Sequence, residues 1–112
     1  MLNTNLKHLE RQEEITEILG ENKNVMISCG RMGPMCTPVY AAMEKLINQY
    51  QNVEFRDMEF DISDASYIRN LSECSSFMGL PFNVYFKEGK VVRATSSIQS
   101  INQIKEILDE VF

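Results

Sequence analysis

The stretch that most constrains the fold is an apolar run that enters a turn containing glycine and proline and leaves it as a periodic segment. Residues 25–28 are mostly apolar and bounded by turn residues, which is typical of a buried strand. The turn reads Cys-Gly-Arg-Met-Gly-Pro-Met-Cys over residues 29–36. Beyond it, apolar side chains recur at helical spacing as far as residue 50. This order predicts a strand, a tight turn and a helix, with two cysteines bracketing the turn.

Patterns of the same kind predict the remaining elements. A first helix that ends at Gly20 is predicted from a stripe of apolar residues: Leu6, Leu9, Ile15, Ile18 and Leu19. Four further elements are expected: a strand over residues 53–60, a short helix over 65–71, a strand hairpin over 81–95 and a last helix over 100–111. Helices between strands imply parallel crossovers, and the hairpin adds an antiparallel pair. A mixed four-stranded sheet with helices on both faces follows.

Size and charge restrict the class of protein. A chain of 112 residues is long enough for one domain with its own core and too short for two. The net charge of −5 disfavours nucleic acid and anionic membrane surfaces as partners, because both attract clustered Lys and Arg. Since no apolar run suits a signal peptide or a membrane span, we expect a cytoplasmic protein. We also expect a monomer or a weak dimer.

Three local motifs stand in order along the chain. Gly33-Pro34 lies at the strand-to-helix turn, Gly-Leu-Pro-Phe at residues 79–82 enters a later strand, and residues 84–91 read as a terminal hairpin. Together with the order of elements, these motifs resemble the thioredoxin fold family over nearly the whole chain. The resemblance implies one thioredoxin-like three-layer α/β sandwich over residues 1–112. The family's usual first strand is expected to be missing or minimal, because the helical pattern begins within a few residues of Met1.

The resemblance also implies a cis peptide bond between Leu80 and Pro81. In the family, this loop lies against the active-site turn, and the backbone of the residue before the proline pairs with an extended substrate. The expected substrate-binding residues are therefore those of the two facing loops: Arg31, Met32, Gly33, Pro34, Leu80 and Pro81.

The usual active site of the family cannot be carried over to this chain. The family's motif is Trp-Cys-Gly-Pro-Cys, and alignment on Gly33-Pro34 places Met32 and Met35 at both cysteine positions. The tryptophan position holds Arg31, and the family's buried acid aligns with Met26.

Cys29 and Cys36 are the candidate catalytic residues, as a dithiol displaced from the family's positions. Cys36 is expected in the first turn of the helix, where the helix dipole and free N–H groups favour a thiolate. A disulfide requires Cα atoms closer than about 7 Å. The leading hypothesis is a thiol–disulfide oxidoreductase without a cofactor, acting on protein disulfides and supplied with electrons by a thioredoxin-reductase-like donor. Cys74, seven residues before Pro81, is a candidate accessory thiol.

Two other functions stay open. A redox-inactive thioredoxin-fold binding module would use an apolar docking patch: Met32, Met35, Phe77, Met78 and Leu80. A soft-metal carrier would bind Cu(I) through a set of sulfur atoms: Met26, Cys29, Met32, Met35 and Cys36.

No other metal site is expected from the sequence, because the cysteines and one histidine are too few for a closed zinc site. His8 is expected to face solvent from the first helix. The acidic residues that follow the second strand pattern are interpreted as strand-end and cap residues: Asp57, Glu59, Asp61 and Asp64.

Overall fold

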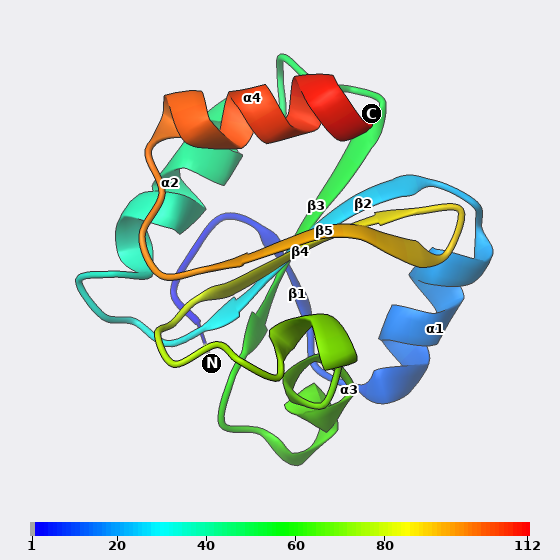
Figure 1. Cartoon of the computed structure of the whole chain (residues 1–112), viewed down its shortest axis with the longest axis vertical. Helices are drawn as coiled ribbons and strands as arrows, with labels where there is room; N and C mark the ends of the chain where they lie inside the picture. The colour runs from blue at the N-terminus through cyan, green and yellow to red at the C-terminus, as the bar shows by residue number, and fades with distance from the viewer. Residues whose placement is uncertain (1) are drawn as a thin grey trace.

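A computed structural model describes residues 2–112, so Met1 lies outside the described residues (Figure 1). Its strands and helices are, in chain order, β1 (Lys7–Leu9), α1 (Gln12–Gly20), β2 (Asn24–Gly30), α2 (Thr37–Leu46), β3 (Val53–Glu59), α3 (Ser66–Arg69), β4 (Phe82–Lys87), β5 (Lys90–Ser96) and α4 (Ile101–Val111). Two short 3-10 turns flank α3, at Ser63–Ala65 and at Ser72–Cys74.

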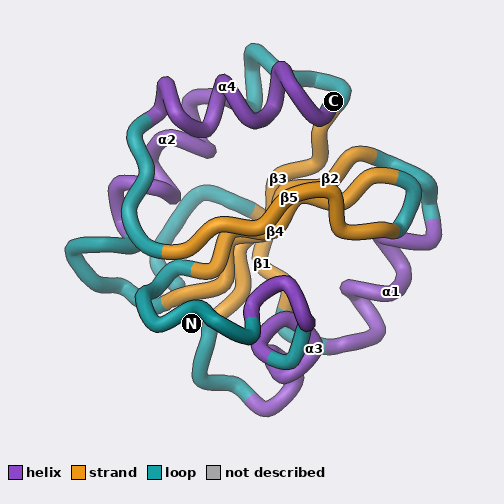
Figure 2. The backbone as a smooth tube through the Cα atoms, in the orientation of Figure 1, coloured by secondary structure: helices purple, strands orange, loops and turns teal. Residues whose placement is uncertain are grey.

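The five strands form one mixed sheet in the order β1-β3-β2-β4-β5. β1, β3 and β2 run parallel, whereas β4 is antiparallel to β2 and β5 is antiparallel to β4. Helices α2 and α4 cover one face of this sheet, and α1 and α3 cover the other (Figures 1 and 2). The predicted three-layer α/β sandwich is confirmed, with five strands in place of four.

Each face of the sheet carries its own hydrophobic core. The α2/α4 core includes Met26, Tyr40, Met43, Tyr85 and Ile104. The α1/α3 core includes Val25, Ile27, Met58, Ile68 and Val84. Neighbouring residues of β2 alternate between the two cores because successive side chains of a strand point to opposite faces. Burying each such side chain stabilises the fold by about 1.5–3 kcal/mol.

The N-terminal segment differs from the prediction. Leu6 and Leu9 are not helical: Leu9 ends β1, whose residues pair in parallel register with Arg56, Asp57 and Met58 of β3. The two leucines have helical spacing, yet Leu6 enters the α2/α4 core and Leu9 enters the α1/α3 core. The predicted stripe therefore merged two elements, and α1 begins only at Gln12.

The C-terminal elements follow the sequence patterns closely. Gly89 adopts the expected positive φ of 78° in the hairpin turn between β4 and β5. Ser100 caps α4, since its hydroxyl accepts the Gln103 N–H at 3.2 Å and the Gln103 side chain accepts the Ser100 N–H at 2.8 Å. None of the helices within residues 2–112 has the length and apolarity that crossing a bilayer requires.

Candidate functional site

The turn between β2 and α2 lies at the carboxyl end of β2 and is closed by its own backbone. The N–H groups of Cys36 and Thr37 both donate to the Gly33 carbonyl, at 3.1 and 3.0 Å. α2 begins at Thr37, which leaves Pro38 in the first turn, where its missing N–H costs no helical hydrogen bond. The helix therefore starts late, after both the turn and Cys36.

Gly30 is the residue at which the β2–α2 turn contacts the loop that contains Pro81. The Leu80–Pro81 peptide bond is cis. A Cβ atom added to Gly30 would lie 2.9 Å from Pro81 Cβ, 2.9 Å from Cys36 Sγ and 2.6 Å from the Tyr40 hydroxyl. Only a residue without a side chain allows this convergence. A third loop joins them, because the Ser97 N–H donates to the Pro81 carbonyl at 3.0 Å.

Tyr40 ties the turn to α2. Its hydroxyl donates to the Arg31 carbonyl at 3.0 Å and, like the Cys36 sulfur, packs against Gly30. Burial, with a smaller contribution from Cys36, raises the pKa of Tyr40 far above its usual range. Tyr40 therefore stays protonated and keeps the turn in place.

Arg31 lies in the turn and is paired with an acidic side chain. Its Nε and Nη2 donate to the two carboxylate oxygens of Asp61 at 2.7 and 2.8 Å. Its guanidinium lies 5.5 Å from the centre of the Phe60 ring, and the Arg69 guanidinium lies equally far from the same ring. This pair raises the pKa of Arg31 and lowers that of Asp61. Both side chains are exposed, so the pair adds little stability and mainly orients the turn.

The structure does not bring the two predicted catalytic cysteines together. Cys29 belongs to the α1/α3 core and Cys36 to the α2/α4 core. The Cys36 sulfur packs on Gly30, whereas the side chain of Cys29, one residue earlier in the same strand, points to the opposite face. Two cysteines oriented in this way need backbone movement before they can form a disulfide. The expectation that they meet across the turn is therefore wrong for this conformation.

All three cysteines are free and buried: Cys29 is 0%, Cys36 3% and Cys74 2% exposed. Burial raises the pKa of Cys29 to about 12, and the charge of Arg69 acts against this rise. Burial likewise raises the pKa of Cys74 to about 11. Both are neutral thiols at pH 7 and poor nucleophiles. Cys74 lies in the same core as Cys29, so the candidate accessory thiol is across the sheet from Cys36.

Methionine side chains, not thiols, reach solvent on the turn and on the loop that leads to cis-Pro81. Met32 is 46%, Met35 44% and Met78 99% exposed. Pro34 is exposed, Gly33 and Leu80 are half-buried, and Pro81 is buried. Beside the turn, a cavity of about 500 Å³ lies between α2 and the start of α4, with Pro38 and Ile98 among its lining residues.

The sulfur atoms proposed for Cu(I) are dispersed. Met26 is fully buried in the α2/α4 core, and Cys29 faces the other side of the sheet. Within residues 2–112, no cluster of three or more His, Cys, Asp or Glu side chains is suited to a metal ion. The soft-metal carrier therefore receives no support from the geometry.

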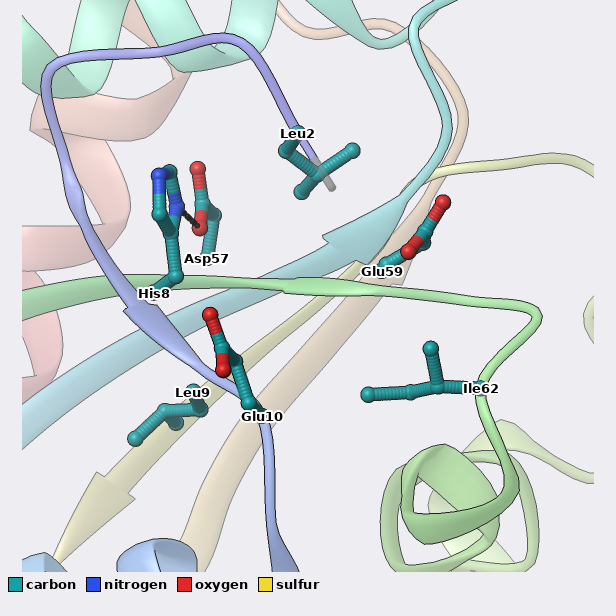
Figure 3. Close-up of a pocket in the computed structure, with 7 residues that line it drawn as sticks. All are labelled: Leu2, His8, Leu9, Glu10, Asp57, Glu59 and Ile62. Atoms are coloured by element: carbon teal, nitrogen blue, oxygen red, sulfur yellow. Dashed lines mark hydrogen bonds and ion pairs between the residues drawn. The ribbon is translucent and has the colours of Figure 1, made fainter.

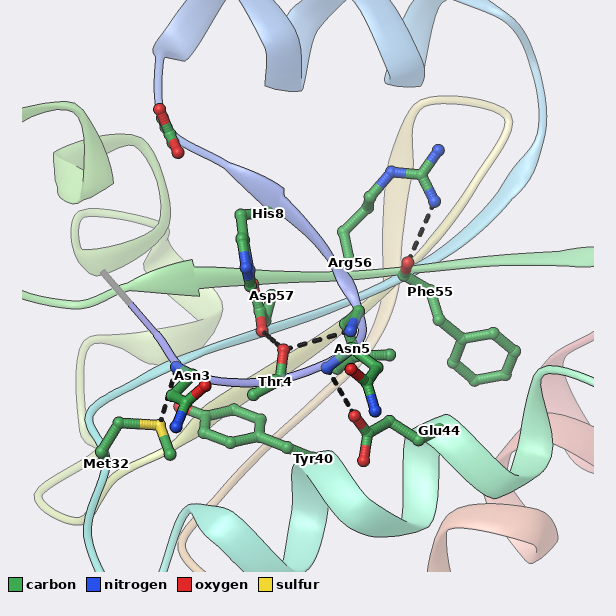
Figure 4. Close-up of polar contacts among 12 residues, drawn as sticks. Asn3, Thr4, Asn5, His8, Met32, Tyr40, Glu44, Phe55, Arg56 and Asp57 are labelled. Atoms are coloured by element: carbon green, nitrogen blue, oxygen red, sulfur yellow. Dashed lines mark hydrogen bonds and ion pairs between the residues drawn. The ribbon is translucent and has the colours of Figure 1, made fainter.

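A polar cluster that was not predicted from the sequence surrounds Asp57 (Figure 4). Asp57 is fully buried within β3, where its carboxylate accepts a hydrogen bond from Thr4 Oγ1 at 2.5 Å and lies 2.5 Å from His8 Nδ1. His8 lies on β1, so its expected place on a solvent-facing helix is wrong, and Asp57 is not a strand-end residue. The alternation of side chains along the strand could have predicted the burial of Asp57. Val53 and Phe55 point into the core, and position 57 continues the same every-second-residue pattern.

A cavity of about 280 Å³ lies beside this cluster (Figure 3). His8 and Asp57 form part of its wall, together with the apolar side chains of Leu2, Leu9 and Ile62. Burial raises the pKa of Asp57, and the hydrogen bonds from Thr4 and His8 act against this rise.

The sheet order, the turn on Gly30 and the cis-proline loop together define a protein of the thioredoxin fold. No family model matches the sequence, and no curated protein matches it significantly. Similar solved structures include Plasmodium falciparum thioredoxin, with a TM-score of 0.78 and 17% identity over 96% of this chain and 100% of that chain.

Two further thioredoxins superpose equally well. Mitochondrial thioredoxin 3 from Saccharomyces cerevisiae has a TM-score of 0.77 and 19% identity, covering 95% of both chains. Fasciola hepatica thioredoxin has a TM-score of 0.77 and 18% identity, covering 94% of this chain and 98% of that chain. At these identities the likeness shows a shared fold, and it leaves the activity to be argued from the site.

Proposed function

We propose that this chain is a thioredoxin-fold binding protein that receives an extended protein segment where the β2–α2 turn faces the cis-Pro81 loop. The observation that carries this proposal is the exposure of Met32 and Met35 on the turn and of Met78 on the cis-Pro81 loop, while the neighbouring thiol, Cys36, is buried. Methionine is flexible and polarizable, so it adapts to varied apolar partners.

A protein partner fits this site better than a small molecule. In the thioredoxin family, the residue before the cis-proline pairs through its backbone with an extended substrate, and Leu80 occupies that position here. The methionines supply adaptable apolar contacts on both sides of it, and the cavity at Pro38 and Ile98 could take one further side chain.

Selection from a displayed library of linear peptides tests this proposal. Selected peptides should bind the wild-type protein, and the double variant Met32→Ser/Met35→Ser should bind them at least about tenfold more weakly, because it loses the central apolar contacts. Ile47→Ser is the matched control, since Ile47 is 39% exposed just beyond the far end of α2. Failure to select any peptide, or equal binding by the double variant, would refute the proposal.

Thiol–disulfide exchange is a second candidate function, and the position of Cys36 favours it. Cys36 is the N-cap residue of α2 and contacts both Tyr40 and the Gly30–Pro81 junction. Its thiolate would attack a protein disulfide, forming a mixed disulfide and releasing the second substrate sulfur as a thiolate. Resolution would then come from another thiol, since Cys29 reaches Cys36 only after the turn rearranges.

This second function would require a thioredoxin-reductase-like electron donor, as expected from the sequence. It would also require a reducing compartment such as the cytoplasm. Insulin reduction with dithiothreitol as electron source tests it. A rate above the uncatalysed one that disappears in Cys36→Ser would support exchange, and persistence of that rate in Cys29→Ser would show that Cys29 is not needed. A wild-type rate equal to the uncatalysed rate excludes this function.

A further inference from the structure

We propose that residues 2–6 form a strap that closes over the α2/α4 core, to which Cys36 belongs, and that opening of this strap controls chemical access to the Cys36 thiol. The proposal stands whether or not the turn binds a protein segment. It rests on contacts that hold the strap to the turn, to α2 and to β3 (Figure 4).

The strap contacts both the β2–α2 turn and α2. The Asn3 N–H donates to Met32 Sδ at 3.4 Å, and the Asn5 N–H donates to the Glu44 carboxylate at 2.6 Å. Leu2 and Leu6 are each 4% exposed and belong to the same core cluster as Cys36. The strap therefore contributes to the burial of the face of the molecule on which this thiol lies.

One buried carboxylate fastens the strap. Thr4 donates its hydroxyl proton to Asp57 Oδ2, and the same hydroxyl oxygen accepts the Leu6 N–H at 3.1 Å. His8, two residues beyond the strap, lies against the other oxygen of Asp57. Loss of the Thr4 hydroxyl leaves one oxygen of a fully buried carboxylate without its hydrogen-bond donor. Removing this one side-chain group therefore destabilises the closed position of the strap.

The strap is also the part of this face that can open by itself. It precedes β1, so it lies outside the sheet ladder that fixes residues 7–9. On its other side, Leu2 lines the 280 Å³ cavity beside His8 and Ile62, so Leu2 is not packed on every side (Figure 3). The backbone N–H groups of Asn3, Asn5 and Leu6 donate to side-chain acceptors and not to a neighbouring strand. A segment held in this way and incompletely packed opens locally without unfolding the domain.

Alkylation by iodoacetamide, followed for each cysteine by peptide mass spectrometry, tests the strap in the intact chain. Thr4→Val keeps the size of the side chain and removes the hydroxyl, and we expect Cys36 to react about tenfold faster. Cys29 and Cys74 lie across the sheet and should keep their wild-type rates. Leu2→Ala, which leaves Asp57 untouched, should produce the same selective increase.

Thr16→Val is the matched control, because the Thr16 hydroxyl donates only to the Glu13 carbonyl on the exposed face of α1. It should leave all three rates unchanged. An equal acceleration of all three cysteines in Thr4→Val and Leu2→Ala would mean general destabilisation and would overturn the proposal. An unchanged Cys36 rate in both variants would overturn it as well.

Discussion

Cys29 and Cys36 lie on opposite faces of one sheet, although only a tight turn separates them in the sequence. The Cys36 sulfur packs on Gly30, the next residue after Cys29. The two thiols are nevertheless separated by the sheet, although the two cysteines are close together in the sequence. The alternation of side chains in β2 decides this arrangement. The sulfur-containing side chains that the turn presents to solvent are those of Met32 and Met35, and their exposure is the basis for the proposed binding function.

Gly30→Ala should destabilise the protein by roughly 1–3 kcal/mol, because the added methyl group overlaps three packed groups. Its Cβ would lie 2.6 Å from the Tyr40 hydroxyl and 2.9 Å from both Cys36 Sγ and Pro81 Cβ. Urea unfolding measures the change. Gly20→Ala is the control, since a Cβ at Gly20 meets nothing within 4 Å. Equal effects of the two variants would show that the junction at Gly30 is not tightly packed.

Tyr85→Phe should leave the free energy of unfolding unchanged or raise it by up to about 1 kcal/mol, because removing an unpaired buried hydroxyl removes its desolvation cost. The Tyr85 hydroxyl is buried and has no hydrogen-bond partner among the described residues. Tyr40→Phe should instead cost about 0.5–1.5 kcal/mol, since it removes the bond to the Arg31 carbonyl. Thermal or urea unfolding of both variants checks the contrast, and a larger loss for Tyr85→Phe would contradict it.

The carboxyl group of Asp57 should titrate above the ordinary value of about 3.9 for an aspartate. Burial is the main cause, opposed by Thr4 and His8 and assisted by Glu44. A raised pKa in the folded state means that this group's stabilising contribution is full below about 3.9 and is lost as pH rises through the folded pKa. Carbon-13 NMR of the side-chain carboxyl groups reads the titration directly.

Thr4→Val should raise the pKa of Asp57 further, because the Thr4 hydroxyl favours the ionised form. Asp61 provides an internal control in the same spectra. Its pKa should lie below the ordinary value owing to Arg31 and should not change in Thr4→Val. A lower pKa for Asp57 than for Asp61 would contradict the burial of Asp57.

Much of the fold follows from local patterns in the sequence. The strand before the turn, the hairpin at Gly89 and the Ser100 cap are each specified by residues close together in the chain. The N-terminal segment is not, because Leu6 and Leu9 have helical spacing but face different cores. Long-range pairing with β3 decides their conformation, and no local pattern contains that information.

The same limit applies to the candidate site. The turn and the cis-proline loop are recognisable as motifs in the sequence, and the structure brings the two loops together at Gly30. The orientation of Cys29 depends on which face each residue of β2 takes, and the partnership of His8 with Asp57 spans 49 positions. Neither property is visible in spacing alone, so the predicted proximity of the two thiols and the predicted solvent-facing helical position of His8 were both wrong for this structure.

The most direct test of a binding site without a dithiol is a count of free thiols after mild oxidation. Wild-type protein would be treated with diamide, then unfolded and alkylated, and its intact mass measured. Buried thiols on opposite faces of the sheet predict three alkylated cysteines, as in the untreated protein. A single alkylated cysteine, with Cys29 and Cys36 joined in one disulfide-linked peptide, would contradict this arrangement and restore the dithiol oxidoreductase.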